Sequence, residues 1–458
     1  MRSVSPFKQH FTGLIALANA NILTWTMKLA HGLCFLYMRV AAVAGAWLDI
    51  PDLPLYFQQL GQFLQIPMAT SSIPTFILDT DHPWLSENRR WLESYPDVAS
   101  ALCDKSSPLW TDPSPGHEIP PDLFRRINID NNKSGIDRLG WDNAVSRLRE
   151  LRDCPAALED VRHLHVYIYV HTGQYSDPLV EPEMPPTELP GLFAEVLTLM
   201  PNLERLDWGL NPNVADVFRE EFVRRNLTLP SVRHLIPGAW SHYLLPMCLG
   251  LETLEAGSFF HHGSWNSGYR EEGDPRRELV RAASVLSSLK EFLMLDSYQT
   301  TEKLEEVLEA MPNLTKLTMQ GSLGRDIDWH ESIISEDIAR NRGGLLKKYL
   351  AVISRFPKLE QLGLPESSRL DLGFDGGNWC GNAYRGAGGR RYGRSVINKR
   401  VETTEIAGDI VAESLPHLKM LWIGEIQANL THNENGDLQI TWPWTGRKEE
   451  YTYEIFPE

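Results

Sequence analysis

Two pairs of side chains have types and spacings that could support metal-dependent chemistry. Asp79 and Asp81 follow the strand-like run at 77–78, and two such carboxylates can hold Mg²⁺ in transferases and phosphatases. His163 and His165 would share one face of a strand and could ligate a metal. Neither pair is followed by the residues that would complete such a site, so we predict no metal site, no cofactor and no catalytic residue. A metal-dependent hydrolase or transferase that uses Asp79 and Asp81 is the alternative.

A segment rich in glycine and arginine could bind an anion. Eight glycines lie between positions 373 and 393, and glycine lets backbone N–H groups approach an anion that arginine can hold with two hydrogen bonds. Segment 373–400 therefore predicts a loop insertion, which we interpret as a basic solvated loop on an acidic body, and a loop that holds a phosphate or an acidic peptide is the alternative. The candidate anion-binding residues are Arg385, Arg390, Arg391 and Arg394.

The composition is that of an acidic globular chain. Its 458 residues exceed what one hydrophobic core usually organises, and 42% hydrophobic residues exclude a wholly disordered chain. The formal net charge of −16 argues against nucleic acid as the main partner. The five cysteines have no Cys-x-x-Cys spacing, so we expect free thiols and a cytoplasmic or nuclear protein.

Residues 1–67 differ from the rest of the chain, because they contain no Glu and hold two apolar stretches within positions 11–48. Three interpretations stay open. The segment could be a helical pair of this protein, a region outside the functional protein with Met68 as the start, or a signal or anchor of a secreted or membrane-attached protein. Residues 68–135 are rich in proline and predict an irregular lead-in.

From residue 136 onward one phrase recurs, an apolar helical stretch followed by Pro-x-Leu-x-x-Leu-x-apolar. In this phrase the last leucine and the final apolar residue alternate as in a strand and point into one core, which the preceding helix covers. Proline ends the helix and sets the start of the strand. One such unit cannot bury its apolar side alone, so neighbouring units must stack. Clear copies begin at Pro201, Pro312, Pro357 and Pro416, and weaker copies begin at Val161, Val232, Leu251 and Leu289.

The copies that end at Leu206, Leu317, Leu362 and Leu421, together with the stretch 436–447, resemble the leucine-rich-repeat proteins. More narrowly, they are similar to the divergent F-box-type members of filamentous fungi. The resemblance covers residues 136–458 and implies an α/β fold, namely an irregular leucine-rich-repeat solenoid with a parallel sheet on its concave face. It also implies a scaffold or substrate-recognition role for a ubiquitin ligase, with a cullin-ligase linker protein as a partner, although no convincing F-box is present.

The third and fifth positions of each phrase, counted from its first apolar residue, would face the open side of this sheet. They define the predicted partner-binding residues, in which Trp422 beside Met420 is a candidate hot spot. These residues are His163, His165, Arg205, Asp207, His234, Glu291, Lys316, Gln361, Met420 and Trp422.

Two insertions and a cap complete the predicted array. Residues 173–190, with five prolines, predict a stiff extended loop, and segment 373–400 is the second insertion. Residues 436–456 alternate with period two on both sides of a turn, which predicts a β-hairpin that caps the array. The sequence as a whole predicts a non-catalytic module that binds another protein.

Overall fold

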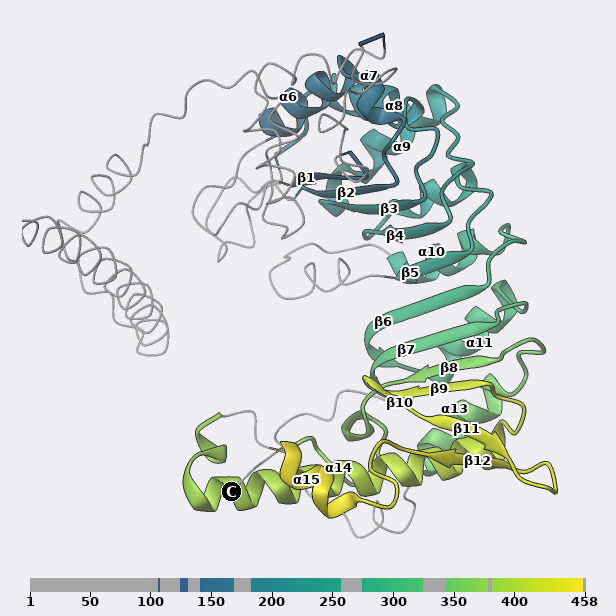
Figure 1. The fold of residues 1–458 in the computed structure, drawn as a ribbon. Helices are drawn as coiled ribbons and strands as arrows, with labels where there is room; N and C mark the ends of the chain where they lie inside the picture. The colour runs from purple at the N-terminus through teal and green to yellow at the C-terminus, as the bar shows by residue number, and fades with distance from the viewer. Residues whose placement is uncertain are drawn as a thin grey trace, which may run out of the picture. The chain divides into compact units, whose positions relative to one another are not determined.

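The computed structural model describes residues 106–107, 124–130, 141–168, 183–256, 274–323, 343–377 and 381–455. Its main feature is a ten-stranded sheet in which each strand lies beside the strand that precedes it in the chain (Figure 1). Strands β1 to β9 are parallel, and β10 turns back antiparallel to β9. The strands are β1 (Arg126–Asp130), β2 (His163–Ile168), β3 (Arg205–Leu210), β4 (His234–Pro237), β5 (Thr253–Ala256), β6 (Glu291–Gln299), β7 (Lys316–Leu323), β8 (Gln361–Leu364), β9 (Met420–Ile423) and β10 (Ile426–Gln427).

Helices or 3₁₀ turns connect most consecutive strands and pack on one side of the sheet (Figure 1). This alternation confirms the predicted α/β class. The α-helices are α6 (Trp141–Arg152), α7 (Pro155–Leu158), α8 (Leu189–Thr198), α9 (Ala215–Arg224), α10 (Pro275–Ala283), α11 (Thr301–Ala310), α13 (Gly344–Ile353), α14 (Gly386–Ser414) and α15 (Lys448–Ile455). The 3₁₀ helices are η3 (Pro212–Val214), η4 (Ser241–Met247), η6 (Ser367–Arg369) and η7 (Gly381–Tyr384).

Every copy of the repeated phrase begins with the same turn. In the copy after α8, the N–H of Leu203 donates to the carbonyl of Met200, so Pro201 occupies the second position of a four-residue turn. Proline is favoured there because its fixed φ matches the turn. The anchor residues of all eight copies donate the same hydrogen bond, at 3.0–3.4 Å, including the four copies of weaker sequence. The turn therefore sets where each strand begins.

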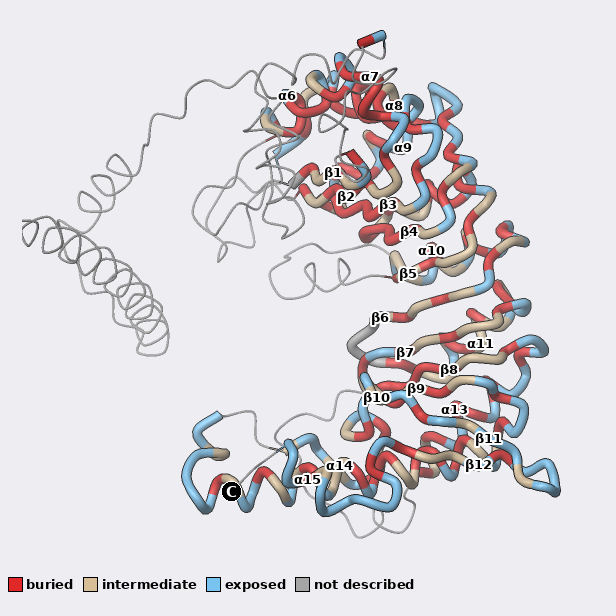
Figure 2. The backbone as a smooth tube through the Cα atoms, in the orientation of Figure 1, coloured by how far each residue is buried: buried red, intermediate tan, exposed pale blue. Residues whose placement is uncertain are grey.

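The apolar positions of the phrase align across the sheet. In the strand pairing, Leu206 lies beside Leu164 on one side and Leu235 on the other, and the same position continues to β9. Buried and half-buried residues alternate along β2 and β9, whereas in β3, β4 and β8 every residue after the first is buried (Figure 2). The aligned and buried residues are Leu164, Leu206, Leu235, Leu254, Phe292, Leu317, Leu362 and Leu421.

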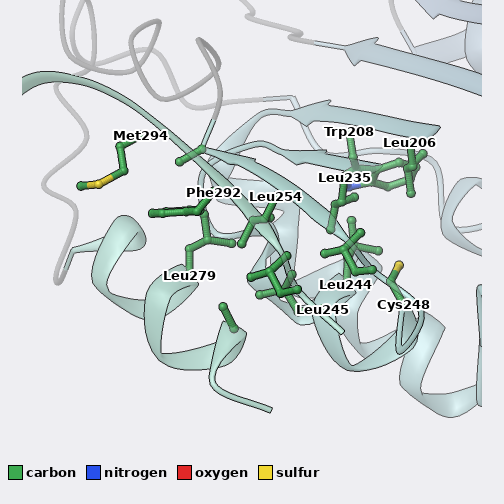
Figure 3. Close-up of a cluster of buried hydrophobic side chains, with 14 of the residues drawn as sticks. Leu206, Trp208, Leu235, Leu244, Leu245, Cys248, Leu254, Leu279, Phe292 and Met294 are labelled. Atoms are coloured by element: carbon green, nitrogen blue, oxygen red, sulfur yellow. The ribbon is translucent and has the colours of Figure 1, made fainter. Parts of the chain in front are cut away.

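Aromatic and aliphatic side chains fill the layer between the sheet and its helices. Trp208 of β3 is fully buried and makes edge-to-face contacts with Phe193 of α8 and Phe218 of α9. Its indole N–H donates to the hydroxyl of Tyr243 at 3.1 Å, so the buried polar groups satisfy each other. Figure 3 shows how side chains of η4 and α10 continue this core beneath β3 to β6.

The predicted start of the array at residue 136 is wrong. Strand β1 (Arg126–Asp130) lies within the region that the sequence predicted as an irregular lead-in, and it pairs in parallel with β2. The predicted loop 173–190 is described only from residue 183, and its last two residues already belong to α8. Pro190 lies in the first turn of α8. N–H groups in the first turn of a helix have no partner within the helix, so the missing N–H of proline costs no hydrogen bond there.

The predicted loop 373–400 is wrong from residue 386 onward, where the long helix α14 begins. Gly389, Gly393, Ile397 and Val401 follow at four-residue intervals and are all buried on one face of this helix. A side chain at Gly389 would collide with the backbone of Tyr384, so this glycine permits close packing. The glycines thus continue a helical contact face instead of interrupting it.

The predicted hairpin 436–456 is also wrong. β12 (Leu438–Thr441) pairs antiparallel with β11 (Asn429–His432), whereas residues 448–455 form helix α15. Thr452 of α15 is buried, and its hydroxyl donates to Asn398 of α14 at 2.7 Å. The alternation of Tyr451, Tyr453 and Ile455 that predicted a strand therefore lies on a helix packed against α14.

Cysteine pairing also differs from the prediction. Cys248 is free and buried, but Cys154 is disulfide-bonded. The expectation of free thiols is wrong at Cys154, so the cysteines give no argument for a reducing compartment. Among the helices that the structure describes, none has both the length and the hydrophobicity needed to cross a bilayer.

Candidate binding face of the sheet

Two rows of side chains, most of them half-buried, cross the side of the sheet that faces away from the core. Strand pairing aligns them residue by residue from β1 to β9, and Glu255 joins the second row through its partner Leu293. Row 1 consists of Arg126, His163, Arg205, His234, Thr253, Glu291, Lys316, Gln361 and Met420. Row 2 consists of Asn128, His165, Asp207, Ile236, Glu255, Leu293, Thr318, Gly363 and Trp422.

The structure brings all ten predicted partner-binding residues together in these rows. Sequence reasoning missed Arg126 and Asn128, because β1 lies in the proline-rich region that was not treated as a repeat. It also left out Thr253 and Glu255, although the weak copy that begins at Leu251 places them at the third and fifth positions. That the rows bind a partner remains a prediction.

Asp207 is the centre of a polar cluster on β2 and β3. Its Oδ2 lies 2.8 Å from Nε2 of His163 and 3.2 Å from Nδ1 of His165, while Nε of Arg205 donates to Oδ1 at 2.8 Å. His163 and His165 point the same way because they alternate on β2, and Asp207 is paired directly with His165. Three side chains from two strands therefore hold one carboxylate.

The electrostatics of the cluster keep Asp207 ionised. Burial alone would raise the pKa of its carboxyl, but hydrogen bonds from His163, His165 and Arg205 outweigh burial and hold the pKa far below its usual range. Burial also lowers the pKa of His163, in spite of its hydrogen bond to Asp207. His163 is therefore a neutral imidazole at pH 7, and it donates its ring N–H to an acceptor-only carboxylate.

Ion pairs and a cation–π contact continue across the two rows. Lys316 lies 3.0 Å from Glu291 on the neighbouring strand. The same ammonium lies 5.9 Å from the centre of the Trp422 ring, two strands away. Gly363 lies in row 2 on β8, the strand between Lys316 and Trp422. Because it has no side chain, it leaves space for the contact between the ammonium and the ring. Trp422 and Met420 are both half-buried, so part of each is accessible.

The four arginines predicted to bind an anion do not form a loop. Arg385 precedes α14, and Arg390, Arg391 and Arg394 lie within that helix, where backbone N–H groups are already hydrogen-bonded. The guanidinium of Arg394 stacks on Tyr453 of α15, 4.9 Å from the ring centre. The loop mechanism that motivated this site does not apply to a helix.

Other predictions lie outside the described residues. These are the carboxylate pair Asp79 and Asp81 and the apolar stretches within 11–48. A scan of the chain against protein-family models found no match, and a search of curated proteins found none either.

Proposed function

We propose that this chain is a non-catalytic, leucine-rich-repeat-type solenoid that binds another protein with rows 1 and 2. The observation that carries the proposal is the residue-by-residue alignment of these rows over nine strands. Repeat arrays use such an extended face for binding, since each strand contributes two or three side chains to one continuous surface. Most of these residues are half-buried and therefore partly accessible, whereas Asp207, Ile236 and Gly363 are buried.

The chemistry of the rows favours a protein partner. Their C-terminal part offers Met420, Trp422 and Leu293, the types of side chain that anchor protein interfaces. Their N-terminal part offers imidazole and guanidinium donors arranged around Asp207. A face that combines apolar anchors with fixed polar groups is suited to a folded or extended polypeptide.

A matched pair of lysine variants tests this proposal. Lys316→Glu places a negative charge on row 1, whereas Lys347→Glu makes the same change on α13, on the helical side of the sheet. Each lysine lies near one glutamate, at 3.0 Å and 3.7 Å, but Lys316 also lies over the Trp422 ring, so the melting temperatures are compared before binding is interpreted. We expect affinity capture with the full chain to lose its partner with Lys316→Glu and to keep it with Lys347→Glu, while both variants melt near the wild type. Equal recovery by the wild type and both variants contradicts a role for the rows.

A role as a ubiquitin-ligase adaptor is the narrower form of the proposal, and it rests on the sequence resemblance. Recovery of a cullin-ligase linker protein with the full chain would support it, and its repeated absence from captures that do recover a partner would reject it. Replacing Asp79 and Asp81 with Asn tests the enzymatic alternative. Unchanged function in that double variant would dispose of an enzyme that depends on these carboxylates.

A further inference from the structure

The cluster of His163, His165 and Asp207 brings three potential metal ligands together. One nitrogen of each imidazole and one carboxylate oxygen lie within 4.8 Å of one another. A tetrahedral zinc site with bonds of about 2.0–2.1 Å needs ligand atoms about 3.3 Å apart. The two distances to Asp207 Oδ2, 2.8 Å and 3.2 Å, are close to that separation. Small rotations of these side chains would admit an ion.

We propose that His163, His165 and Asp207 bind a divalent transition metal, with Zn²⁺ as the best fit, on the exposed side of β2 and β3. Two imidazoles and one carboxylate are a borderline-soft donor set, which suits Zn²⁺ and Co²⁺ and is unlike the all-oxygen sets of Ca²⁺ and Mg²⁺. This site is additional to the proposed binding of a protein, and neither depends on the other.

The surroundings of the three residues match what a metal site requires. Arg205 donates to Oδ1 of Asp207 at 2.8 Å and contacts Oδ2 only at 3.5 Å, so its stronger bond orients the carboxylate as hydrogen-bonded neighbours do in known sites. The histidine side chains are 19% and 25% exposed, so an ion can enter and a fourth position stays open to water or to a partner.

The positive charges of the cluster limit the affinity. Arg205 already neutralises Asp207, and the charge of Arg126 also acts on this carboxylate. A divalent ion would therefore meet a site with little net negative charge. We expect affinity in the micromolar range, weaker than that of structural zinc sites with thiolate ligands.

Glutamine variants test the site without removing the hydrogen bonds of Asp207. The side-chain amide of His163→Gln or His165→Gln can still donate to Asp207 but is a poor zinc ligand. His234→Gln is the matched control, because His234 lies in row 1 on the next strand and faces a single carboxylate, Glu255, at 3.5 Å. The probes are ZnCl₂, followed by calorimetry, and Co²⁺, whose visible absorption reports tetrahedral coordination. The full chain is used after removal of any histidine tag.

The chain has 14 histidines, so the result is read as a difference between variants. We expect one equivalent of Zn²⁺ and the tetrahedral Co²⁺ absorption to be lost in His163→Gln and His165→Gln and kept in His234→Gln. A weakening of at least about a hundredfold at this site counts as loss, since even changes outside the ligand set cost ten- to a hundredfold. Identical titrations of the wild type and all three variants would overturn the proposal and leave the cluster as a hydrogen-bonded support for Asp207.

Discussion

Replacing Asp207 with Asn should destabilise the sheet far more than a similar change elsewhere on the same face. The side chain of Asp207 is 6% exposed, and it accepts hydrogen bonds from Arg205, His163 and His165. Asn has nearly the same shape but has no charge, and one of its two terminal atoms is a donor that would face other donors. The variant therefore loses both the charge-assisted bond and part of the acceptor capacity.

The expected loss is about 3 kcal/mol in the free energy of unfolding. Hydrogen bonds to charged groups contribute about 1.5–3 kcal/mol each, and breaking a buried pair costs about 3–5 kcal/mol. The lower part of this range applies because Arg205 is 39% exposed and can be hydrated when it loses its partner. Glu255→Gln is the control, since its single contact to His234 at 3.5 Å should be worth less than about 1 kcal/mol.

Urea unfolding of the full chain, followed by tryptophan fluorescence and far-UV circular dichroism, measures both values. EDTA in the buffer makes the result independent of any bound metal. Because the pKa of Asp207 is depressed by folding, its contribution is complete above its ordinary value of 3.8 and is lost as the pH falls through the folded value. The difference between wild type and Asp207→Asn should persist at about pH 5 and shrink below about pH 4. A difference under about 1 kcal/mol at pH 7 would refute the view that this cluster holds β2 and β3 together.

Three further predictions concern the core and α14. Leu362→Ala removes a fully buried side chain and should cost about 2–5 kcal/mol in urea unfolding. Leu249→Ala, at a position that is 67% exposed, should cost under about 0.5 kcal/mol, and equal costs would contradict the described core. Gly389→Ala should lower the melting temperature because its side chain collides with η7, whereas Gly388→Ala meets open space and should raise stability by up to about 1 kcal/mol. Burial raises the pKa of the Cys248 thiol to about 12, so iodoacetamide should label it only after unfolding, and rapid labelling of Cys248 itself in the native chain at about pH 8, located by peptide mass spectrometry, would count against this burial.

The strands from β2 to β9 could be predicted because each copy of the phrase contains both local signals that define a strand, a turn and an apolar alternation. The turn fixes the first residue of the strand, and the apolar alternation fixes which side chains point inward, as at Leu203 and Leu206. Both signals are local, so the uneven spacing of the phrases does not disturb them. The spacing of the copies differs in the length of chain between the end of one strand and the turn that begins the next, and the strands still pair in register.

The errors arose where a local signal had two physical meanings. Glycine at positions 389 and 393 indicated a loop, but at four-residue intervals it also gives a helix a surface for close contact. The alternation at 451–455 fits a strand in isolation, and only packing against α14 makes it helical. In β1, Ile127 and Ile129 alternate as in a strand, but they lie in the proline-rich region that predicted an irregular lead-in.

The Asp207 cluster could not be predicted in full, because it depends on the register of two strands. His163 and His165 are close in sequence, but Asp207 follows His163 by 44 residues, and a shift of one residue in the pairing would place it on the core side of the sheet. The sequence placed all three on one face without showing that they meet. Strand pairing adds the carboxylate of Asp207 to His163 and His165, and the three side chains together offer three ligand atoms.

This pairing has a consequence for recognition by rows 1 and 2. Fixing a flexible side chain at an interface costs about 0.5–1.5 kcal/mol, and charged side chains on a sheet face would normally incur that cost on binding. Here Arg205 is held by Asp207 and Lys316 lies between Glu291 and Trp422 before any partner arrives. Under the proposed function, a partner would contact side chains that are already ordered, because folding has fixed them beforehand. Breaking one of these internal pairs should weaken binding even where the changed residue does not contact the partner, because its neighbour is then free to move.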